Sequence, residues 1–293
     1  MKLWLAFISL VVLLSSCEKA INFKLDSTQA SLVVEATIEN SQPPVVILSS
    51  SFDYFSNISA ELLAGSFVHN AVITISNGTK TQQLKEYFYN TQANLKVYYY
   101  SIDSSNLAGA FTGAFSTVYT MNIQVNGKTY TANTSIPALA KKVDSLWWKK
   151  APDNPDSSKV VLVAKATDPP GFGNYIRYFT KVNSEPFYPG MNSVFDDQII
   201  DGTTYTLDVD RGVNRNEKID MENYVFFNKG DTITLKLTNI DKATFDFWRT
   251  MEYSYQSIGN PFSSPTRVTG NINGALGYFG GYAAQYKTII VPK

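Results

Sequence analysis

The chain has 293 residues, and its 25 basic residues cancel its 25 acidic residues. A chain with no net charge is not expected to attract nucleic acid electrostatically. The sequence also has no polybasic segment of the kind that binds anionic lipid headgroups. Charged residues make up only 17% of the chain while aromatic residues make up 14%. That aromatic content, with abundant Thr, Ser, Asn and Val, favours β-strands over helices.

The N-terminus has the pattern of an export signal. Lys2 supplies a positive charge, and an apolar run from Leu3 to Leu14 follows it. This run is too short to span a bilayer comfortably as a helix. One alternative is that Cys17 only ends an ordinary signal peptide, or begins an uncleaved anchor. An ordinary cleavage site prefers Ala-x-Ala-like residues, and none stands near position 17.

The stretch Leu14-Ser15-Ser16-Cys17 resembles the lipobox of bacterial lipoproteins. The resemblance implies that residues 1–16 are removed as a signal peptide and that Cys17 becomes the acylated first residue. Residues 17–27 are then a lipidated tether. The absence of any other cysteine supports this interpretation, because a lone thiol in an exported chain has no disulfide partner.

Residues 28–138 are predicted to form an immunoglobulin-like β-sandwich. Apolar side chains alternate along the segment Ser31–Glu39, as in a half-buried strand. Asn77-Gly78 and Asn126-Gly127 are strong hairpin signals. About seven strands separated by turns, without a strong helix, are typical of such a sandwich. The other expected strands are Val45–Leu48, His69–Ser76, Leu95–Ile102, Ser116–Val125 and Lys128–Asn133, with a helical turn at Ser59–Leu63.

Residues 143–293 are predicted to form a second β-rich domain with one packed helix near 241–257. Asp241 is suited to cap that helix, and Gly259 and Pro261 end it. Apolar residues behind the cap recur at spacings of three and four, which is the pattern of an amphipathic helix: Phe245, Trp248, Met251 and Tyr255. The expected strands are Lys159–Thr167, Tyr175–Asn183, Thr204–Val209, Asp231–Leu237 and Lys287–Val291.

The residue inventory is poor in catalytic groups. His69 is the only histidine, so any serine or cysteine triad depends on it, and Cys17 is committed to lipid. His69 lies on an alternating strand, where a structural role is expected. Zinc sites draw on Cys and His and are not expected either. We therefore predict a protein that is not an enzyme, with no cofactor, no catalytic residue and no metal ligand.

Calcium binding is the open alternative, because the segment Asp208–Glu217 is rich in oxygen donors. An EF-hand loop starting at Asp208 needs Gly at its sixth position and Glu at its twelfth, where the chain has Val213 and Ile219. The default interpretation is a solvated loop in which Arg211 and Arg215 neutralise the acids. Three further aspartates precede the segment: Asp196, Asp197 and Asp201.

Carbohydrate chemistry is the second alternative. Glu185, Asp196 and Glu222 are acids of the type that glycosidases use in pairs, but no pattern brings them together. Three aromatic clusters offer faces that stack on sugars, although aromatics on alternating strands are more often core residues. The clusters are Phe52–Phe55, Tyr87–Tyr89 and Tyr98–Tyr100.

The glycine-rich stretch Gly270–Gly281 matches no phosphate-binding motif, since it has neither the P-loop lysine nor a G-x-G-x-x-G pattern. Close backbone packing or a flexible partner-contact loop explains it better. Neighbouring residues on an extended chain point to opposite sides. We therefore predict that Phe279 packs inside and that Tyr278 contacts a partner.

Several motifs together resemble an uncharacterised family of Bacteroidota outer-membrane lipoproteins, a domain-of-unknown-function family often encoded beside TonB-dependent receptors. They are Leu14–Cys17, Leu32–Ala36, Val68–Ile75, Gly127–Tyr130, and Asn260–Phe262 leading to Gly270–Gly280. The resemblance implies an outer-membrane location and genes for TonB-dependent receptors nearby, but it implies no reaction.

We expect a lipid-anchored accessory protein of the outer membrane, at the cell surface in preference to the periplasmic face. Its partners are the bilayer, through acylated Cys17, and an integral β-barrel protein such as a TonB-dependent receptor. A subunit of an outer-membrane assembly or secretion machine, and a glycan-binding or glycan-active protein, are the alternatives.

Overall fold

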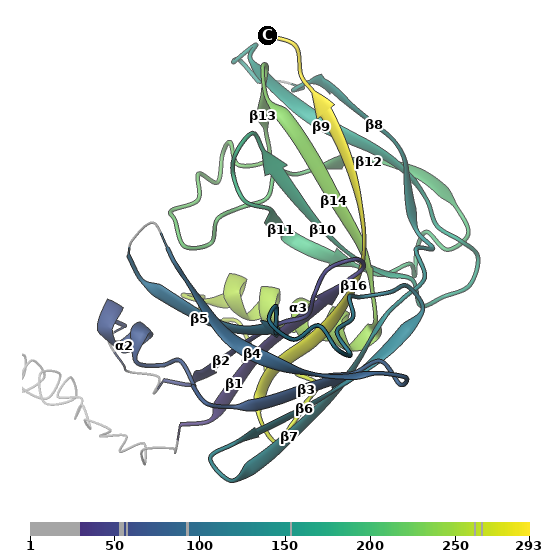
Figure 1. Ribbon diagram of the computed structural model, residues 1–293. Coiled ribbons are helices and arrows are strands. Elements are labelled where there is room, and N and C mark those ends of the chain that lie inside the picture. The colour runs from purple at the N-terminus through teal and green to yellow at the C-terminus, as the bar shows by residue number, and fades with distance from the viewer. Residues whose placement is uncertain are drawn as a thin grey trace, which may run out of the picture. The chain divides into compact units, whose positions relative to one another are not determined.

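Figure 1 shows the computed structural model, which describes residues 30–52, 56, 58–91, 94–152, 154–260, 262–264 and 266–293. Residues Ser31–Ser51 and Asn57–Lys293 fold into one compact unit. That unit holds all the strands and helices given below. The predicted signal peptide at 1–16, the tether at 17–27 and the lipidation site Cys17 lie outside the described residues.

The unit is mainly β, as the composition predicts. Two helices occur in the described part of the chain: α2 (Ala60–Ala64) and α3 (Lys242–Ser257). The strands before residue 140 are β1 (Leu32–Glu39), β2 (Val45–Ser50), β3 (Val72–Ser76), β4 (Thr81–Asn90), β5 (Lys96–Ile102), β6 (Thr117–Val125) and β7 (Lys128–Ile136). Those after it are β8 (Lys142–Lys150), β9 (Lys159–Thr167), β10 (Tyr175–Val182), β11 (Tyr188–Phe195), β12 (Thr204–Val209), β13 (Phe227–Asn228), β14 (Thr232–Ile240), β15 (Ile272–Asn273) and β16 (Leu276–Ile290).

Hydrogen bonding connects most strands into one long path, in the order β11-β10-β14-β16-β1-β2-β5-β4-β3-β6-β7-β15. A second sheet has the order β12-β9-β13, with β8 also paired to β9. The long strand β16 joins the two parts of the path. Its first half runs parallel to β1 and its second half antiparallel to β14 (Figure 1).

The buried apolar residues form three clusters. The first fills the space among β1–β7 and takes Phe279 and Ala283 from β16. The second lies between the two sheets of the C-terminal half. The third packs α3 against β16. Residues before 140 make up most of the first cluster and residues after 140 make up the second, while β16 contributes side chains to the first and third clusters.

The glycine-rich stretch is mostly strand, because β16 begins at Leu276, eleven residues before the predicted final strand. Here the glycines allow close backbone packing, which is one of the two predicted explanations. A Cβ atom at Gly277 would lie 1.9 Å from the Val34 carbonyl oxygen, and one at Gly281 would lie 2.2 Å from that of Ser135. Only a residue without a side chain lets β16 pass β1 and β7 this closely.

Helix α3 confirms the helix predicted near 241–257. The Asp241 carboxylate accepts a hydrogen bond from the Thr244 backbone N–H at 2.9 Å and so caps the first turn. Its other oxygen accepts from Thr134 Oγ1 and from the Ser135 backbone N–H, each at 2.9 Å. One carboxylate therefore both starts the helix and fixes it to β7. No described helix combines the length and the hydrophobicity that crossing a bilayer would require.

Candidate functional sites

His69 lies just before β3 and contacts a carboxylate. Its Nδ1 pairs with Glu86 Oε1, and Tyr100 donates to the other Glu86 oxygen at 3.1 Å. Partial burial acts to raise the pKa of Glu86, but the hydrogen bonds from His69, Tyr100 and the Asn70 backbone lower it on balance. The contact holds the 68–70 segment against β4. His69 was expected on the strand His69–Ser76, but β3 begins only at Val72.

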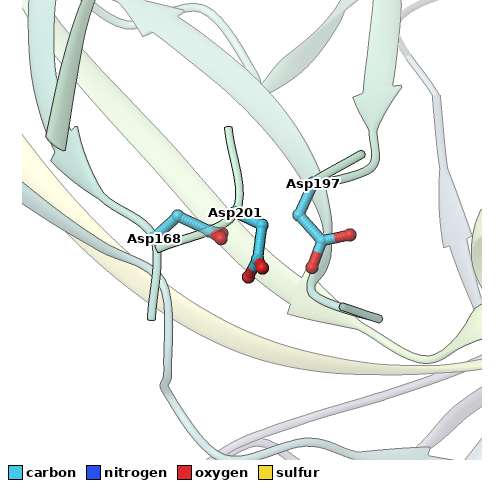
Figure 2. Close-up of side chains that lie close together, drawn as sticks. All are labelled: Asp168, Asp197 and Asp201. Atoms are coloured by element: carbon cyan, nitrogen blue, oxygen red, sulfur yellow. The ribbon is translucent and has the colours of Figure 1, made fainter. Parts of the chain in front are cut away.

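Three carboxylates converge near one end of β9 (Figure 2). Asp168 directly follows β9, while Asp197 and Asp201 lie in the loop from β11 to β12. An oxygen from each lies within 4.8 Å of the others. The surrounding backbone supports them: Asp201 accepts from the Gly171 N–H at 2.6 Å, and Asp197 from the Asn174 N–H at 2.9 Å. These are oxygen donors of the kind that calcium prefers.

A lysine supplies positive charge to this carboxylate cluster. Lys141 Nζ lies 2.7 Å from Asp168 Oδ1, and both side chains are 0% exposed. The Lys141 backbone is held in turn, because Asn239 Nδ2 and Gln285 Nε2 donate to its carbonyl oxygen at 3.0 and 2.8 Å. The Lys141 ammonium group thus supplies the positive charge that a bound cation would otherwise supply to these carboxylates. We interpret the cluster as a buried ion pair with two neighbouring acids.

The segment Asp208–Glu217, considered above as an alternative calcium loop, does not gather its oxygen donors at one point among the described residues. Asp208 pairs with Lys149 at 2.8 Å, and Asn214 donates to Glu217 at 2.6 Å. The interpretation that its arginines neutralise its own acids is wrong. Both arginines instead reach outside the loop: Arg211 pairs with Glu185 at 2.6 Å and Arg215 with Glu252 at 3.3 Å. Of the predicted acids, Asp197 and Asp201 meet Asp168, a residue that the loop pattern did not indicate.

A buried polar network joins β10, β11 and α3. The Arg177 guanidinium lies 3.4 Å from the centre of the Trp248 ring, and its Nε donates to Ser193 Oγ at 3.0 Å. Ser193 donates in turn to Glu252, which also pairs with Arg215. The Ser193 hydroxyl is held by an arginine and a carboxylate, with no histidine beside it, so its contacts are those of a structural link.

The acids considered for glycoside hydrolysis have separate surroundings. Glu185 is paired with Arg211, Asp196 lies beside the apolar C-terminal core, and Glu222 lies in an exposed turn stabilised by Asp220. The geometry gives no support to a carboxylate pair built from them.

The distal half of the β4–β5 hairpin carries five aromatic side chains, which we name the aromatic ribbon: Tyr87, Phe88, Tyr89, Tyr98 and Tyr99. Cross-strand pairs place Tyr87 opposite Tyr99 and Phe88 opposite Tyr98, with ring centres 5.8 and 5.9 Å apart. Successive residues on a strand point to opposite faces, so aromatic rings cover both faces of the ribbon.

The ribbon has no third strand beside it among the described residues. Strand β2 pairs with β5 only at Val46 and Tyr100, and β3 pairs with β4 only from Thr81 to Gln83. Tyr100 is therefore buried, while Phe88 and Tyr89 are 53% and 52% exposed. The interpretation of these aromatics as core residues is right for Tyr100 and wrong for Phe88 and Tyr89.

Comparison with known proteins gives a family. A profile described as "Domain of unknown function (DUF4249)" matches residues 18–288. The chain belongs to this family. No curated protein matches it. The DUF4249 match takes in the aromatic ribbon, the carboxylate cluster, α3 and almost all of β16.

Within the DUF4249 fold, Tyr278 lies inside. Its side chain is 4% exposed and stacks on Phe247, with ring centres 4.4 Å apart. Phe279 is 0% exposed and lies in the first cluster, so the two neighbours do point to opposite sides. Helix α3 covers the side of β16 on which Tyr278 lies. The glycine pattern of the sequence did not indicate this helix contact. Tyr278 is therefore a packing residue, and we do not retain it as a partner contact.

Proposed function

We propose that this DUF4249 protein is a lipid-anchored accessory protein of the bacterial outer membrane that docks on an integral β-barrel protein. A TonB-dependent receptor is the partner we favour, and the cell surface is the face we favour. The protein works by binding and carries out no reaction. The aromatic ribbon is the observation that carries the proposal.

The ribbon has the chemistry of a protein interface. A two-stranded hairpin is marginally stable alone in water, and exposed aromatic rings on both faces add to the surface that a partner could cover. Tyr and Phe are enriched at interfaces, where a few of them provide most of the binding free energy. Lys96, which lies 4.8 Å from the Phe88 ring centre, adds a charged group at the same place.

Anchoring supports a partner in the same membrane. Acyl chains on Cys17 would confine the chain to the bilayer surface and raise its effective concentration toward integral proteins. Several acyl chains at about 0.8 kcal/mol per buried CH₂ would suffice without a polybasic segment. Cys17→Ser should therefore move the protein out of the membrane fraction. A variant that stays membrane-bound after a high-salt wash, with no partner present, would refute the anchor.

The docking test compares two surface variants. Phe88→Ser with Tyr89→Ser removes the two most exposed rings of the ribbon, and Phe172→Ser removes an exposed ring from the β9–β10 loop. Tagged proteins are purified from solubilised outer membranes, and the partners are identified by mass spectrometry. We expect the ribbon variant to be lipidated and folded but to lose the β-barrel partner, while the Phe172 variant keeps it. Equal recovery of the partner with both variants would refute docking through the ribbon.

Sugar binding is a second candidate, because exposed aromatic faces also stack on pyranose rings. The stacked pair Tyr87 and Tyr99 offers the flattest such surface, with 29° between the rings. Binding of oligosaccharides to the purified protein, lost in Tyr99→Ser, would favour this function. A role in an outer-membrane assembly machine uses the same docking surface, and the identity of the partner decides between it and a receptor.

A further inference from the structure

The C-terminal half contains a cavity of about 710 Å³ between its two sheets. One wall comes from β10 and β14 and the opposite wall from β9 and β12; α3 and the loop after β11 complete it. Protein interiors are close-packed, and voids much larger than a water molecule are few. A volume of this size is instead typical of a small-molecule site.

The sequence leaves this space open by placing alanines on the inner face of β9. Ala164 is paired with Leu207 and Ala166 with Tyr205, and all four side chains line the cavity. One register step further, Leu162 and Val209 are large enough to close the space, and both are buried. The cavity is therefore set by two small residues in an otherwise well-packed strand.

The cavity opens to solvent between the edge strands of the two sheets, β11 and β12, which end their respective strand orders. Leu207 points inward and yet is 39% exposed, and two apolar residues of the β11–β12 segment beside it, Phe195 and Ile199, are also exposed. Inward-facing apolar side chains that remain in contact with water indicate a surface that an apolar ligand would cover.

The charged groups around the cavity are mostly acidic: Asp196, Asp208 and Asp210 against Arg249. Asp208 is paired with Lys149, and Arg249 lies 3.9 Å from Asp246. Asp210 makes no ion pair with any described residue. Burial raises the pKa of Asp210, and the neighbouring Asp208 raises it further. An anionic ligand end would add a like charge to this region, whereas a neutral or cationic end would not.

We propose that this cavity binds a small apolar molecule whose polar end is neutral or cationic, and that it discriminates against anionic amphiphiles. The site lies on strands other than those of the aromatic ribbon. Ligand binding and docking can therefore fail independently of each other.

The test uses residues 17–293 with Cys17→Ser, the expected mature chain without its acyl chains, so that no detergent is present to compete for the site. N-Phenyl-1-naphthylamine, a neutral dye that fluoresces in apolar surroundings, is titrated and then displaced. Three ten-carbon competitors are used below their micelle concentrations: decan-1-ol, decyltrimethylammonium and decanoate. We expect one dye per chain, displaced by the first two at least about tenfold more effectively than by decanoate. No dye binding, or equal displacement by decanoate, would overturn the proposal.

A filling variant locates the dye. Ala164→Leu with Ala166→Leu adds side chains to the cavity wall, while Thr206→Leu adds one to the exposed face of β12 as a matched control. We expect the double variant to lose about tenfold or more in dye affinity, with an unchanged or raised melting temperature because an apolar void is filled. The control should bind as the parent does. A folded double variant with undiminished affinity would place the dye elsewhere and refute the site.

A charge variant tests the selectivity and does not depend on filling the cavity. Asp210→Asn removes one of the two cavity acids that make no ion pair with a described residue, the other being Asp196, so decanoate should displace the dye more effectively than from the parent. If the filling variant fails to fold, this variant still decides the question. Unchanged displacement by decanoate in Asp210→Asn would refute the role given to Asp210 in discriminating against anionic ligands. The ribbon variant Phe88→Ser with Tyr89→Ser should bind the dye normally.

Discussion

Lys141→Met breaks the ion pair on which the carboxylate cluster depends. The lysine and Asp168 are both 0% exposed and lie 2.7 Å apart. Removal of the ammonium leaves a buried carboxylate within 4.8 Å of the acids of Asp197 and Asp201. Loss of one partner from a buried pair costs about 3–5 kcal/mol. For a chain of this size each kcal/mol corresponds to about 2–4 °C, so we expect the melting temperature to fall by roughly 6–20 °C.

The assay is urea unfolding, supported by thermal melts at matched ionic strength. Lys165→Met, on the exposed face of β9, is the control and should change stability by less than about 0.5 kcal/mol. Lys141→Met combined with Asp168→Asn removes both charges and should recover a substantial part of the loss. A loss below about 1 kcal/mol in Lys141→Met, or no recovery in the double variant, would refute the role given to this pair.

Three further predictions concern the wild-type chain and its core. Because Lys141 already compensates the acids, a chelator should leave the melting temperature unchanged; a fall that calcium reverses would show a bound metal that stabilises the fold. Phe279→Ala should lower the free energy of unfolding by about 3–5 kcal/mol in urea, since this ring is fully buried in the first cluster. The pKa of Glu86 is lowered in the fold from its ordinary 4.5, so its stabilising effect exists above that value and fades as pH falls through the folded pKa. Thermal melts from about pH 6 to about pH 3 should show the advantage of wild type over Glu86→Gln shrinking, and a pH-independent difference would contradict this.

The sequence predicted those elements whose signal is local. Strand β9 has the bounds predicted for it, because its residues are almost all apolar and a turn follows at Asp168. Helix α3 was predicted from the Asp241 cap and the apolar spacing behind it. In both cases the pattern within the segment decides the structure.

Other elements depend on contacts that local patterns do not carry. Strand β11 contains Pro189 and Gly190, which indicate a turn, yet it is an edge strand whose outer carbonyl groups accept hydrogen bonds from Arg215. For β16 the sequence pattern indicates only the last residues, from Lys287, because glycines weaken the strand signal before them. In the structure these glycines permit close backbone packing.

The candidate sites are the part of the structure that the sequence predicts least well, because they too depend on contacts between segments far apart in the chain. Asp168 and Asp197 meet only because the β11–β12 loop folds back to the end of β9, and Lys141 reaches Asp168 from the segment before β8. The aromatic alternation on β5 is the same for Tyr98 as for Tyr100. Tyr100 lies beside β2 and is buried, whereas Tyr98 lies beyond that pairing and is only half-buried, against Phe67 and His69.

Photocrosslinking in cells tests the central claim most directly. A benzophenone amino acid replaces Tyr89 at the ribbon, or Phe172 as the control, in the otherwise native lipidated protein. We predict that irradiation links the Tyr89 position to an integral outer-membrane β-barrel protein, identified by mass spectrometry, and that the Phe172 position gives no such adduct. An adduct pattern that is the same at both positions, or the absence of any β-barrel adduct at the Tyr89 position, would contradict the account.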